Sequence, residues 1–177
     1  MMKELEFPYN KEKIEELKAG EFVFLTGKIY TARDQVHRKL VELIKKDKKL
    51  PFNLKNQIIY YCGPTPSSRE RVIGSCGPTT SSRMDKFSEP LLKKGLLGMI
   101  GKGQRDKEIR ELLKKYKAVY FVAPSGCGAL LSQKVNSKRL IAFAYLKAEA
   151  VYELEVKNFP LVVAIDTKGN DIYERFY

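Results

Sequence analysis

The chain has 177 residues, and 33 Lys and Arg against 21 Asp and Glu give it a formal net charge of +12. A hydrophobic content of 44% beside 31% charged residues is typical of a folded globular protein and excludes a disordered chain. No apolar run reaches the roughly 18 residues of a membrane-spanning helix, the N-terminal segment lacks the apolar stretch of a secretory signal, and three cysteines favour a reducing cytoplasm over a disulfide scaffold.

Apolar residues recur with a period of two in some segments and at helical spacing in others, which predicts alternating strands and helices. In chain order we predict a helix over 11–19, a strand over 21–30, a helix from Thr31 to about 49, strands over 57–62 and 71–76, a helix from Thr79 or Thr80 to 94, a strand over 96–100, a helix over 106–116, a strand over 118–123, a short helix over 126–134, and strands over 139–144, 151–157 and 161–166. This alternation indicates a single α/β domain over residues 1–177, with 1–20 as a lead-in and a more antiparallel C-terminal end.

An internal repeat stands out between the predicted strands and the second helix. CGPTPSSR at 62–69 and CGPTTSSR at 76–83 differ at one position. Two similar strand exits would explain the Gly-Pro pairs, but not why both copies also carry hydroxyls and an Arg. If the second copy opens a helix, its free N–H groups and the hydroxyls of Thr79, Thr80, Ser81 and Ser82 form a cradle for an anion. Arg83 lies four residues after Thr79, on the same helical face, and its planar guanidinium suits a carboxylate.

Two further basic clusters lie where α/β folds place ligands. Arg33 and His37 fall in the first turn of a predicted helix, where cations are unfavourable, so either Asp34 compensates them or they serve an anionic ligand. A lone histidine is more often structural. Lys102 lies between two glycines at a strand end, without the pattern of a nucleotide-binding loop. We predict that Arg33, Arg83 and Lys102 converge on a small polyanion such as a dicarboxylate.

The remaining positive charge is mostly Lys scattered in pairs on predicted helix surfaces, which suits a solvated surface and a heat-adapted protein. A nucleic-acid binder often adds a compact basic tract or aromatic stacking platforms, so we do not expect nucleic acid as a partner. A stand-alone module that binds carboxylates or nucleic acid stays open as a non-enzymatic alternative. The cysteines at 62, 76 and 127 lack metal-ligand spacing, and we predict no metal site in this chain.

Four segments resemble one known family. They are GKIYTARDQVHRKL (27–40), CGPTP (62–66), IGSCGPTTSSRMD (73–85) and GMIGKG (98–103). They are similar to the β subunit of class I fumarate hydratases and to the β subunit of L-tartrate dehydratase, over nearly the whole chain from Gly27 to about Asp166. The resemblance implies a swivelling β/β/α domain with a mixed sheet and flanking helices. It also implies a cytoplasmic, oxygen-sensitive hydro-lyase of the tricarboxylic acid cycle.

The resemblance further implies a [4Fe–4S] cluster held by three cysteines of an α subunit, with no cofactor bound by this chain alone. The chain would then be inactive by itself and would pair with another β chain inside an α₂β₂ assembly. Residue by residue, Arg33, Arg83 and Lys102 match substrate-carboxylate binders and Thr79 a proton-transfer residue. We add Thr80 as a substrate contact and His37 as a catalytic residue, because both belong to the matching motifs. Reversible hydration of fumarate to (S)-malate is the main hypothesis, and L-tartrate dehydration is the alternative.

Overall fold

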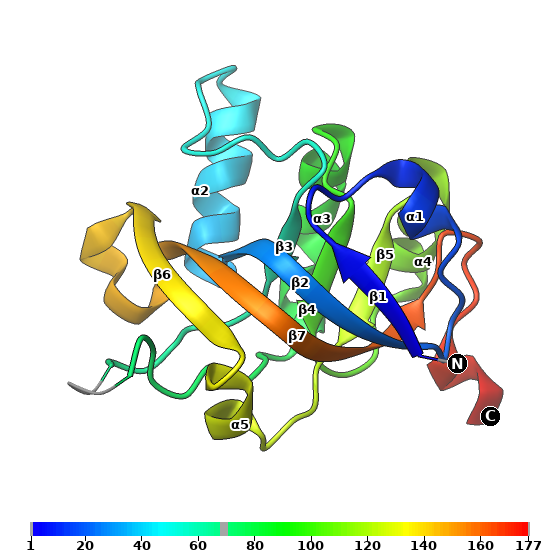
Figure 1. The fold of residues 1–177 in the computed structure, drawn as a ribbon. Coiled ribbons are helices and arrows are strands. Elements are labelled where there is room, and N and C mark those ends of the chain that lie inside the picture. Colours follow the sequence, from blue (N-terminus) through cyan, green and yellow to red (C-terminus); the bar gives the residue numbers. More distant parts are fainter. Residues whose placement is uncertain (1, 68–70, 177) are drawn as a thin grey trace.

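The computed structural model describes residues 2–67 and 71–176 and consists of one mixed β-sheet with helices packed against it (Figure 1). The strands are β1 (Met2–Glu6), β2 (Phe22–Thr31), β3 (Ile58–Tyr60), β4 (Gly98–Gly101), β5 (Val119–Val122), β6 (Val135–Ala142) and β7 (Val151–Ile165). The α-helices are α1 (Lys11–Glu15), α2 (Asp34–Lys45), α3 (Asp85–Lys93), α4 (Lys107–Tyr116) and α5 (Gly128–Ser132). Three 3₁₀ helices complete the set: η1 (Ser81–Met84), η2 (Ala144–Glu149) and η3 (Ile172–Phe176). The predicted α/β class, with a mixed sheet and flanking helices, is confirmed.

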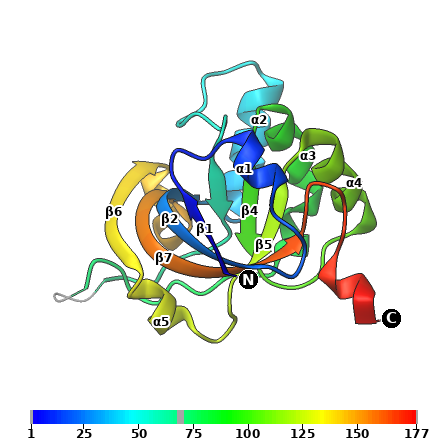
Figure 2. The same ribbon diagram turned by 45° about the vertical axis from the view of Figure 1, so that its right-hand side comes forward.

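The sheet closes on itself. Its strand order is β1-β2-β3-β4-β5-β7-β6, and β2 also pairs with β7, so that β2, β3, β4, β5 and β7 form a five-stranded barrel. Neighbouring strands from β2 to β5 are parallel, whereas β7 is antiparallel to β2, β5 and β6. The long strand β7 curves strongly around the barrel (Figure 2). The predicted antiparallel character of the C-terminal end is therefore confirmed, whereas the closure of the sheet into a barrel was not predicted.

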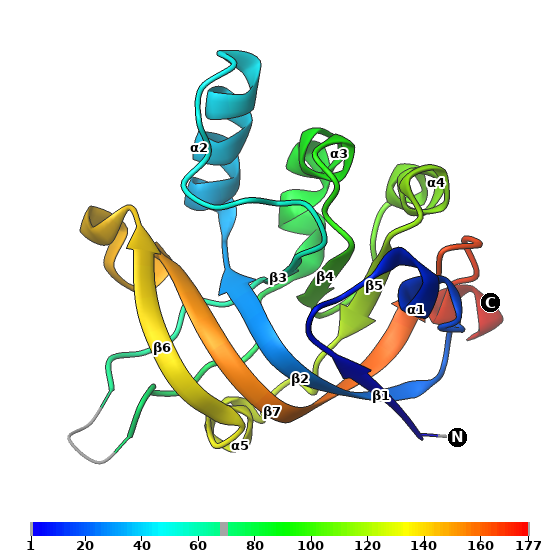
Figure 3. The ribbon, with the colours of Figure 1, turned by 45° about the horizontal axis from the view of Figure 1, so that its top comes forward.

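Helices α2, α3 and α4 lie side by side on one face of the sheet (Figure 3). Side chains alternate across each strand, so neighbouring residues enter different cores. Tyr60 faces the barrel interior with Leu25 and Phe121, whereas Tyr61 faces the helices with Leu40 and the rest of that layer. This two-sided burial holds the carboxyl ends of β2, β3 and β4 in a rigid frame. Among the described residues, no helix has both the length and the apolar character that crossing a bilayer requires.

Several predicted elements differ from the structure. The lead-in contains strand β1, which pairs in parallel with β2 and was not predicted. Residues 71–76 have an irregular backbone instead of a strand. The last two predicted strands are one, β7, which continues through Asn158 and Pro160 because β2 pairs with it on both sides of this point. The helix expected from 79 or 80 begins as η1 and becomes α-helical only at Asp85.

The helix expected from Thr31 to about 49 is shorter at both ends, spanning Asp34–Lys45 with Arg33 as the N-cap. Thr31 does not cap it, because its hydroxyl is used elsewhere. The Thr31 Oγ1 donates to the Ala150 carbonyl (3.2 Å) and accepts from the Tyr152 amide (3.0 Å). Thr31 thus ties the end of β2 to the start of β7 and closes the barrel next to Arg33.

Candidate anion-binding site

The predicted cations follow the carboxyl ends of adjacent parallel strands. Thr31 at the end of β2 is in register with Tyr60 at the end of β3, and Tyr60 is in register with Ile100 of β4. Arg33 and Lys102 therefore leave the sheet at the same carboxyl end of its strands, two strands apart. We call this end, after β2, β3 and β4, the open edge. This edge is where open and closed parallel sheets present ligand-binding groups.

Arg33 is held by an acidic residue that the sequence did not single out. Its Nη2 lies 3.1 Å from Oε1 of Glu149 in η2, and both side chains are about a quarter exposed (24%). A methyl group at Gly63 would lie 2.8 Å from Nη1 of Arg33, so the absence of a side chain there makes room for the guanidinium. Within the described chain, Nε of Arg33 and Oε2 of Glu149 have no hydrogen-bond partner. The pair thus leaves hydrogen-bonding capacity on both partners.

His37 is buried directly beneath Arg33. Its side chain is 1% exposed and contacts the rings of Tyr61 and Phe87. Its Nδ1 lies 2.9 Å from the Arg33 carbonyl oxygen, which can only accept, so Nδ1 carries the proton. Burial lowers the pKa of His37 to about 4, and the hydrogen bond to Arg33 offsets only part of that effect. This position favours holding the Arg33 backbone, and a catalytic role for His37 stays a prediction.

The buried imidazole makes stability depend on pH. Since the pKa of His37 is about 4 in the folded chain and about 6.5 when unfolded, only the unfolded chain binds its proton between these values. The free energy of unfolding should therefore fall as pH drops from about 6.5 to about 4, by roughly 3 kcal/mol from this residue. Denaturation of the wild type and of His37→Gln at pH 7, 5 and 4 measures the difference in slope. His37 is the only histidine, so NMR titration reports its pKa directly. Equal slopes, or a pKa near 6.5, would contradict this account.

Arg83 forms an ion pair with Asp34, through Nη2 and Oδ2, although its side chain is about half exposed (49%). This pair joins η1 to the first turn of α2, next to Arg33. The sequence offered Asp34 as a counter-charge for Arg33 and His37. In the structure the carboxylates pair differently: Glu149 pairs with Arg33, and Asp34 pairs with Arg83.

The predicted cradle of free backbone N–H groups at 79–82 is wrong for two of its amides. The Thr79 amide donates to the Tyr61 carbonyl (2.7 Å), and the Ser81 amide donates to the Lys102 carbonyl (3.0 Å). The segment extends the edge of the sheet, with Thr80 forming a parallel bridge to Lys102, before any helix begins. The Ser81 hydroxyl is also wrong as a ligand group, because it is buried and accepts from the Lys102 amide (3.0 Å). The hydroxyls of Thr79, Thr80 and Ser82 and the cations remain as candidate ligand groups. Thr79 is half-buried and Thr80 is exposed.

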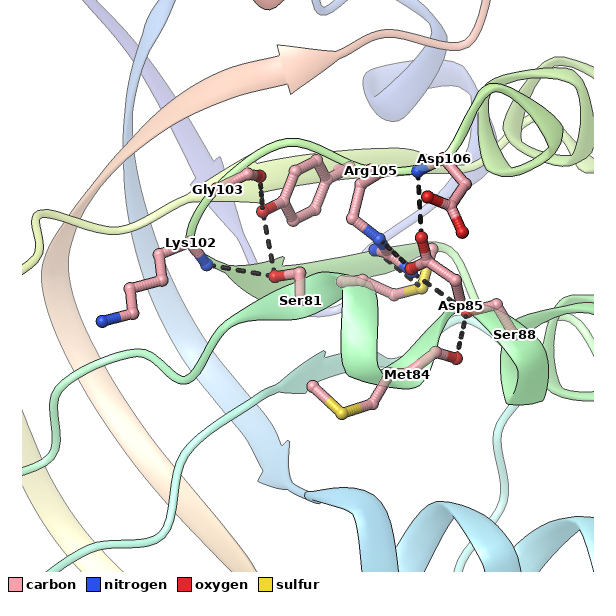
Figure 4. Close-up of polar contacts among 10 residues, drawn as sticks. Ser81, Met84, Asp85, Ser88, Lys102, Gly103, Arg105 and Asp106 are labelled. Atoms are coloured by element: carbon pink, nitrogen blue, oxygen red, sulfur yellow. Dashed lines mark hydrogen bonds and ion pairs between the residues drawn. The ribbon is translucent and has the colours of Figure 1, made fainter.

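Lys102 differs from the two arginines because it makes no ion pair with any side chain in the described part of the chain. Figure 4 shows its side chain pointing away from the polar cluster around Ser81 and Arg105. The bridge between Thr80, which precedes η1, and Lys102, which follows β4, therefore brings the segment with Thr79 and Arg83 to the same edge as Lys102, and the Arg83–Asp34 pair joins it to the helix start beside Arg33.

A buried ion pair lies under this edge, between Arg105 and Asp85 (Figure 4). The Arg105 side chain has no exposed surface, its Nε lies 2.5 Å from Asp85 Oδ1, and its Nη2 donates to Ser88 (3.1 Å). The guanidinium lies over the rings of Tyr61 (5.5 Å) and Tyr120 (5.0 Å). Sequence reasoning missed Arg105. The sequence contained only an indirect signal, because its partner Asp85 ends the motif SSRMD, in which Arg83 is the exposed cation.

The repeat places two cysteines together in the barrel core, both buried. The neighbouring Cys76 thiol and burial raise the pKa of Cys62 well above its ordinary value. Cys127 is the partly exposed N-cap of α5. In the described ranges no three His, Cys, Asp or Glu side chains are arranged to hold a metal ion, so these residues do not fit an iron–sulfur cluster. Arg69, which ends the first copy, lies outside the described residues.

Two cavities have linings that include none of the predicted site residues. One of about 410 Å³ is at the C-terminal end of the helix and is lined by Ile44, Phe52 and several lysines. The other, about 300 Å³, lies between the first repeat and η2, and its lining includes Lys138, Lys147 and Tyr152. The cations at the strand ends therefore sit on an open edge rather than in either cavity.

The family model described as "Fumarase C-terminus" matches residues 2–176. A protein of Methanocaldococcus jannaschii named "Putative L(+)-tartrate dehydratase subunit beta" is 44% identical, covering 96% of this chain and 92% of that protein. "Fumarate hydratase class I, anaerobic" of Escherichia coli is 36% identical, and "Fumarate hydratase 1, mitochondrial" of Leishmania major is 37% identical. Each of these two matches covers 85% of this chain but only 28% of the relative's length.

Proposed function

This chain belongs to the fumarase C-terminus family, and from that premise we propose that it is the β-type subunit of a hydro-lyase acting on a four-carbon dicarboxylate. The observation that supports the proposal is the open edge at the ends of β2, β3 and β4, where Thr80 bridges to Lys102 and Arg83 pairs with Asp34, the residue after Arg33. Three cations suit a substrate with two carboxylates.

L-Tartrate is the substrate we place first. The relative of nearly equal length is named a tartrate dehydratase β subunit, whereas the fumarate hydratases match this chain over 28% of their length. Fumarate and (S)-malate form the second candidate pair, which the identity of 36–37% to those enzymes supports. Both reactions remove water from a 2-hydroxy dicarboxylate, and the same cations would serve either substrate.

The chemistry asked of this chain is binding and charge stabilisation. Loss of a proton from the carbon next to a carboxylate moves negative charge onto that carboxylate, and fixed cations stabilise the charge. Arg33 and Arg83 would exchange Glu149 and Asp34 for substrate carboxylates, which offer the same oxygen ligands. Lys102 would not have to release a carboxylate first, because it has no ion-pair partner in the described part of the chain. Thr79 would hold or pass a proton only with strong help from its surroundings, because a hydroxyl is a weak acid.

The rest of the site would come from an α-type partner, because a relative of nearly the same length is named a β subunit. An iron–sulfur cluster would be bound by that partner, where it would act as a Lewis acid on the departing hydroxyl. The open edge of this chain would then face the partner, and β–β pairing inside an α₂β₂ assembly is part of the proposal.

Co-expression with a candidate α chain from the same genome, followed by anaerobic cluster reconstitution, tests this function. We expect dehydration of L-tartrate, of (S)-malate, or of both, only when the two chains are present, with product formation followed by NMR. The ratio of kcat/KM for the two substrates then assigns the enzyme. Turnover by this chain alone, or no turnover of either substrate by the assembled complex, would overturn the proposal.

A further inference from the structure

We propose that Tyr120 is a positioning residue, whose hydroxyl fixes the segment that carries Thr79 and Arg83 against the loop that carries Lys102. The inference rests on the proposed function for its kinetic consequence, but its structural part stands on this chain alone. Tyr120 lies in β5, is fully buried, and is not among the residues proposed to touch a ligand.

The Tyr120 hydroxyl completes a closed chain of hydrogen bonds that includes Ser81, Lys102 and Gly103. The Lys102 amide donates to Ser81 Oγ (3.0 Å), and the Ser81 amide donates to the Lys102 carbonyl (3.0 Å). The Tyr120 hydroxyl lies 2.9 Å from Ser81 Oγ and donates to the Gly103 carbonyl (2.7 Å). Because the single Tyr120 hydroxyl proton points to the Gly103 carbonyl, the Ser81 hydroxyl donates to the Tyr120 oxygen, so each hydroxyl in the chain both donates and accepts.

The Ser81 side chain packs closely against Gly101. A methyl group at Gly101 would lie 1.9 Å from Ser81 Oγ and 2.9 Å from the Tyr61 ring. Tyr120 itself is held by the Arg105 guanidinium over its ring, 5.0 Å from the centroid. A side chain so constrained fixes the distance between the strands that its hydroxyl joins.

Residues 81–85 and residues 102–106 are joined by hydrogen bonds at both ends. Ser81 is bonded to Lys102 at one end, and four residues later Asp85 accepts from Arg105 (2.5 Å) and from the Asp106 amide (2.9 Å). Arg83 lies midway between these ties, and Lys102 is at one of them. Loss of the Tyr120 hydroxyl loosens the tie nearest the proposed ligand groups and leaves the Asp85–Arg105 tie in place.

The kinetic test compares Tyr120→Phe with Tyr9→Phe in the reconstituted two-chain enzyme. Tyr9 is equally buried and its hydroxyl donates to the Lys28 carbonyl (3.0 Å), on β2 rather than at the strand ends. Both variants should lose similar thermal stability. Only Tyr120→Phe should lower kcat/KM, about tenfold, with KM rising more than kcat falls because the cations bind carboxylates before and during reaction. Equal kinetics for the two variants would overturn the positioning role.

A second measurement needs no activity. Amide hydrogen exchange in the full chain should show faster exchange at the Ser81 and Lys102 amides in Tyr120→Phe, with β2 and β7 unchanged, and no such change in Tyr9→Phe. Unchanged protection at these two amides would overturn the structural part. If the assembled wild type turns over neither substrate, the proposed function fails while this exchange result still decides the tie.

Discussion

Arg83→Ala should lower kcat/KM of the assembled enzyme at least tenfold. Arg83 is half exposed at the open edge, so its guanidinium can reach a ligand, and its present partner, Asp34, is a carboxylate of the same chemistry as the proposed substrate. A charged hydrogen bond contributes about 1.5–3 kcal/mol, which corresponds to roughly a ten- to 150-fold effect. The side chain is not part of the core, so the melting temperature should change little.

The matched control for this variant is Arg139→Ala. Arg139 is also exposed and also pairs with a carboxylate, Glu153 (3.0 Å), but it lies on the edge strand β6. It should leave kcat/KM unchanged. Steady-state kinetics of both variants on the better of the two substrates measures the difference. If Arg83→Ala and Arg139→Ala behave alike, Arg83 does not bind the substrate.

Asp85→Ala should cost about 3–5 kcal/mol of unfolding free energy, because it leaves the buried Arg105 charge without its partner. Arg105 has no exposed side-chain surface, and the rings of Tyr61 and Tyr120 cannot replace a carboxylate. Glu89→Ala is the control on the same helix, since the Glu89 side chain is partly exposed (42%) and pairs with Lys93 at 3.3 Å. That variant should cost no more than about 1 kcal/mol.

A double variant separates an unpaired charge from a simple loss of packing. Asp85→Leu together with Arg105→Met removes both charges and fills similar volume, so it should be more stable than Asp85→Ala alone. Urea denaturation of the three variants and the wild type at pH 7 provides the comparison. A double variant less stable than Asp85→Ala would mean that the pair contributes through its hydrogen bonds to Ser88 and Asp106, rather than through compensation of a buried charge.

Apart from the strand expected over 71–76, the order of strands and helices from β2 to α4 could be predicted, because each element carries its own periodicity and several are followed by Gly or Pro. The closed barrel could not, since it depends on β7 pairing with β2 over a sequence separation of more than one hundred residues. Strand β1 was missed because its residues, MKELE, alternate without a strongly apolar face, and only its pairing with β2 defines it.

The candidate site was partly predictable for a similar reason. Arg33, Arg83 and Lys102 stand out because cations beside Gly, Thr or a helix start are unusual, and strand ends gather at one edge. Their partners depend on tertiary contacts. Glu149 reaches Arg33 across more than one hundred residues, and Tyr120 reaches Ser81 from the next strand of the sheet. The amides of Thr79 and Ser81 were assigned to a ligand because no local pattern shows that they bond to the sheet edge.

The central claim is that this open edge binds the two carboxylates of the substrate. A crystal structure of the assembled two-chain enzyme with L-tartrate or (S)-malate tests it most directly. The account predicts carboxylate oxygens within hydrogen-bond distance of the Arg83 guanidinium and the Lys102 ammonium, with Arg33 released from Glu149 toward the ligand. A dicarboxylate bound elsewhere on this chain, such as in the cavity beside Lys138 and Lys147, without contact to Arg33, Arg83 or Lys102, would contradict it.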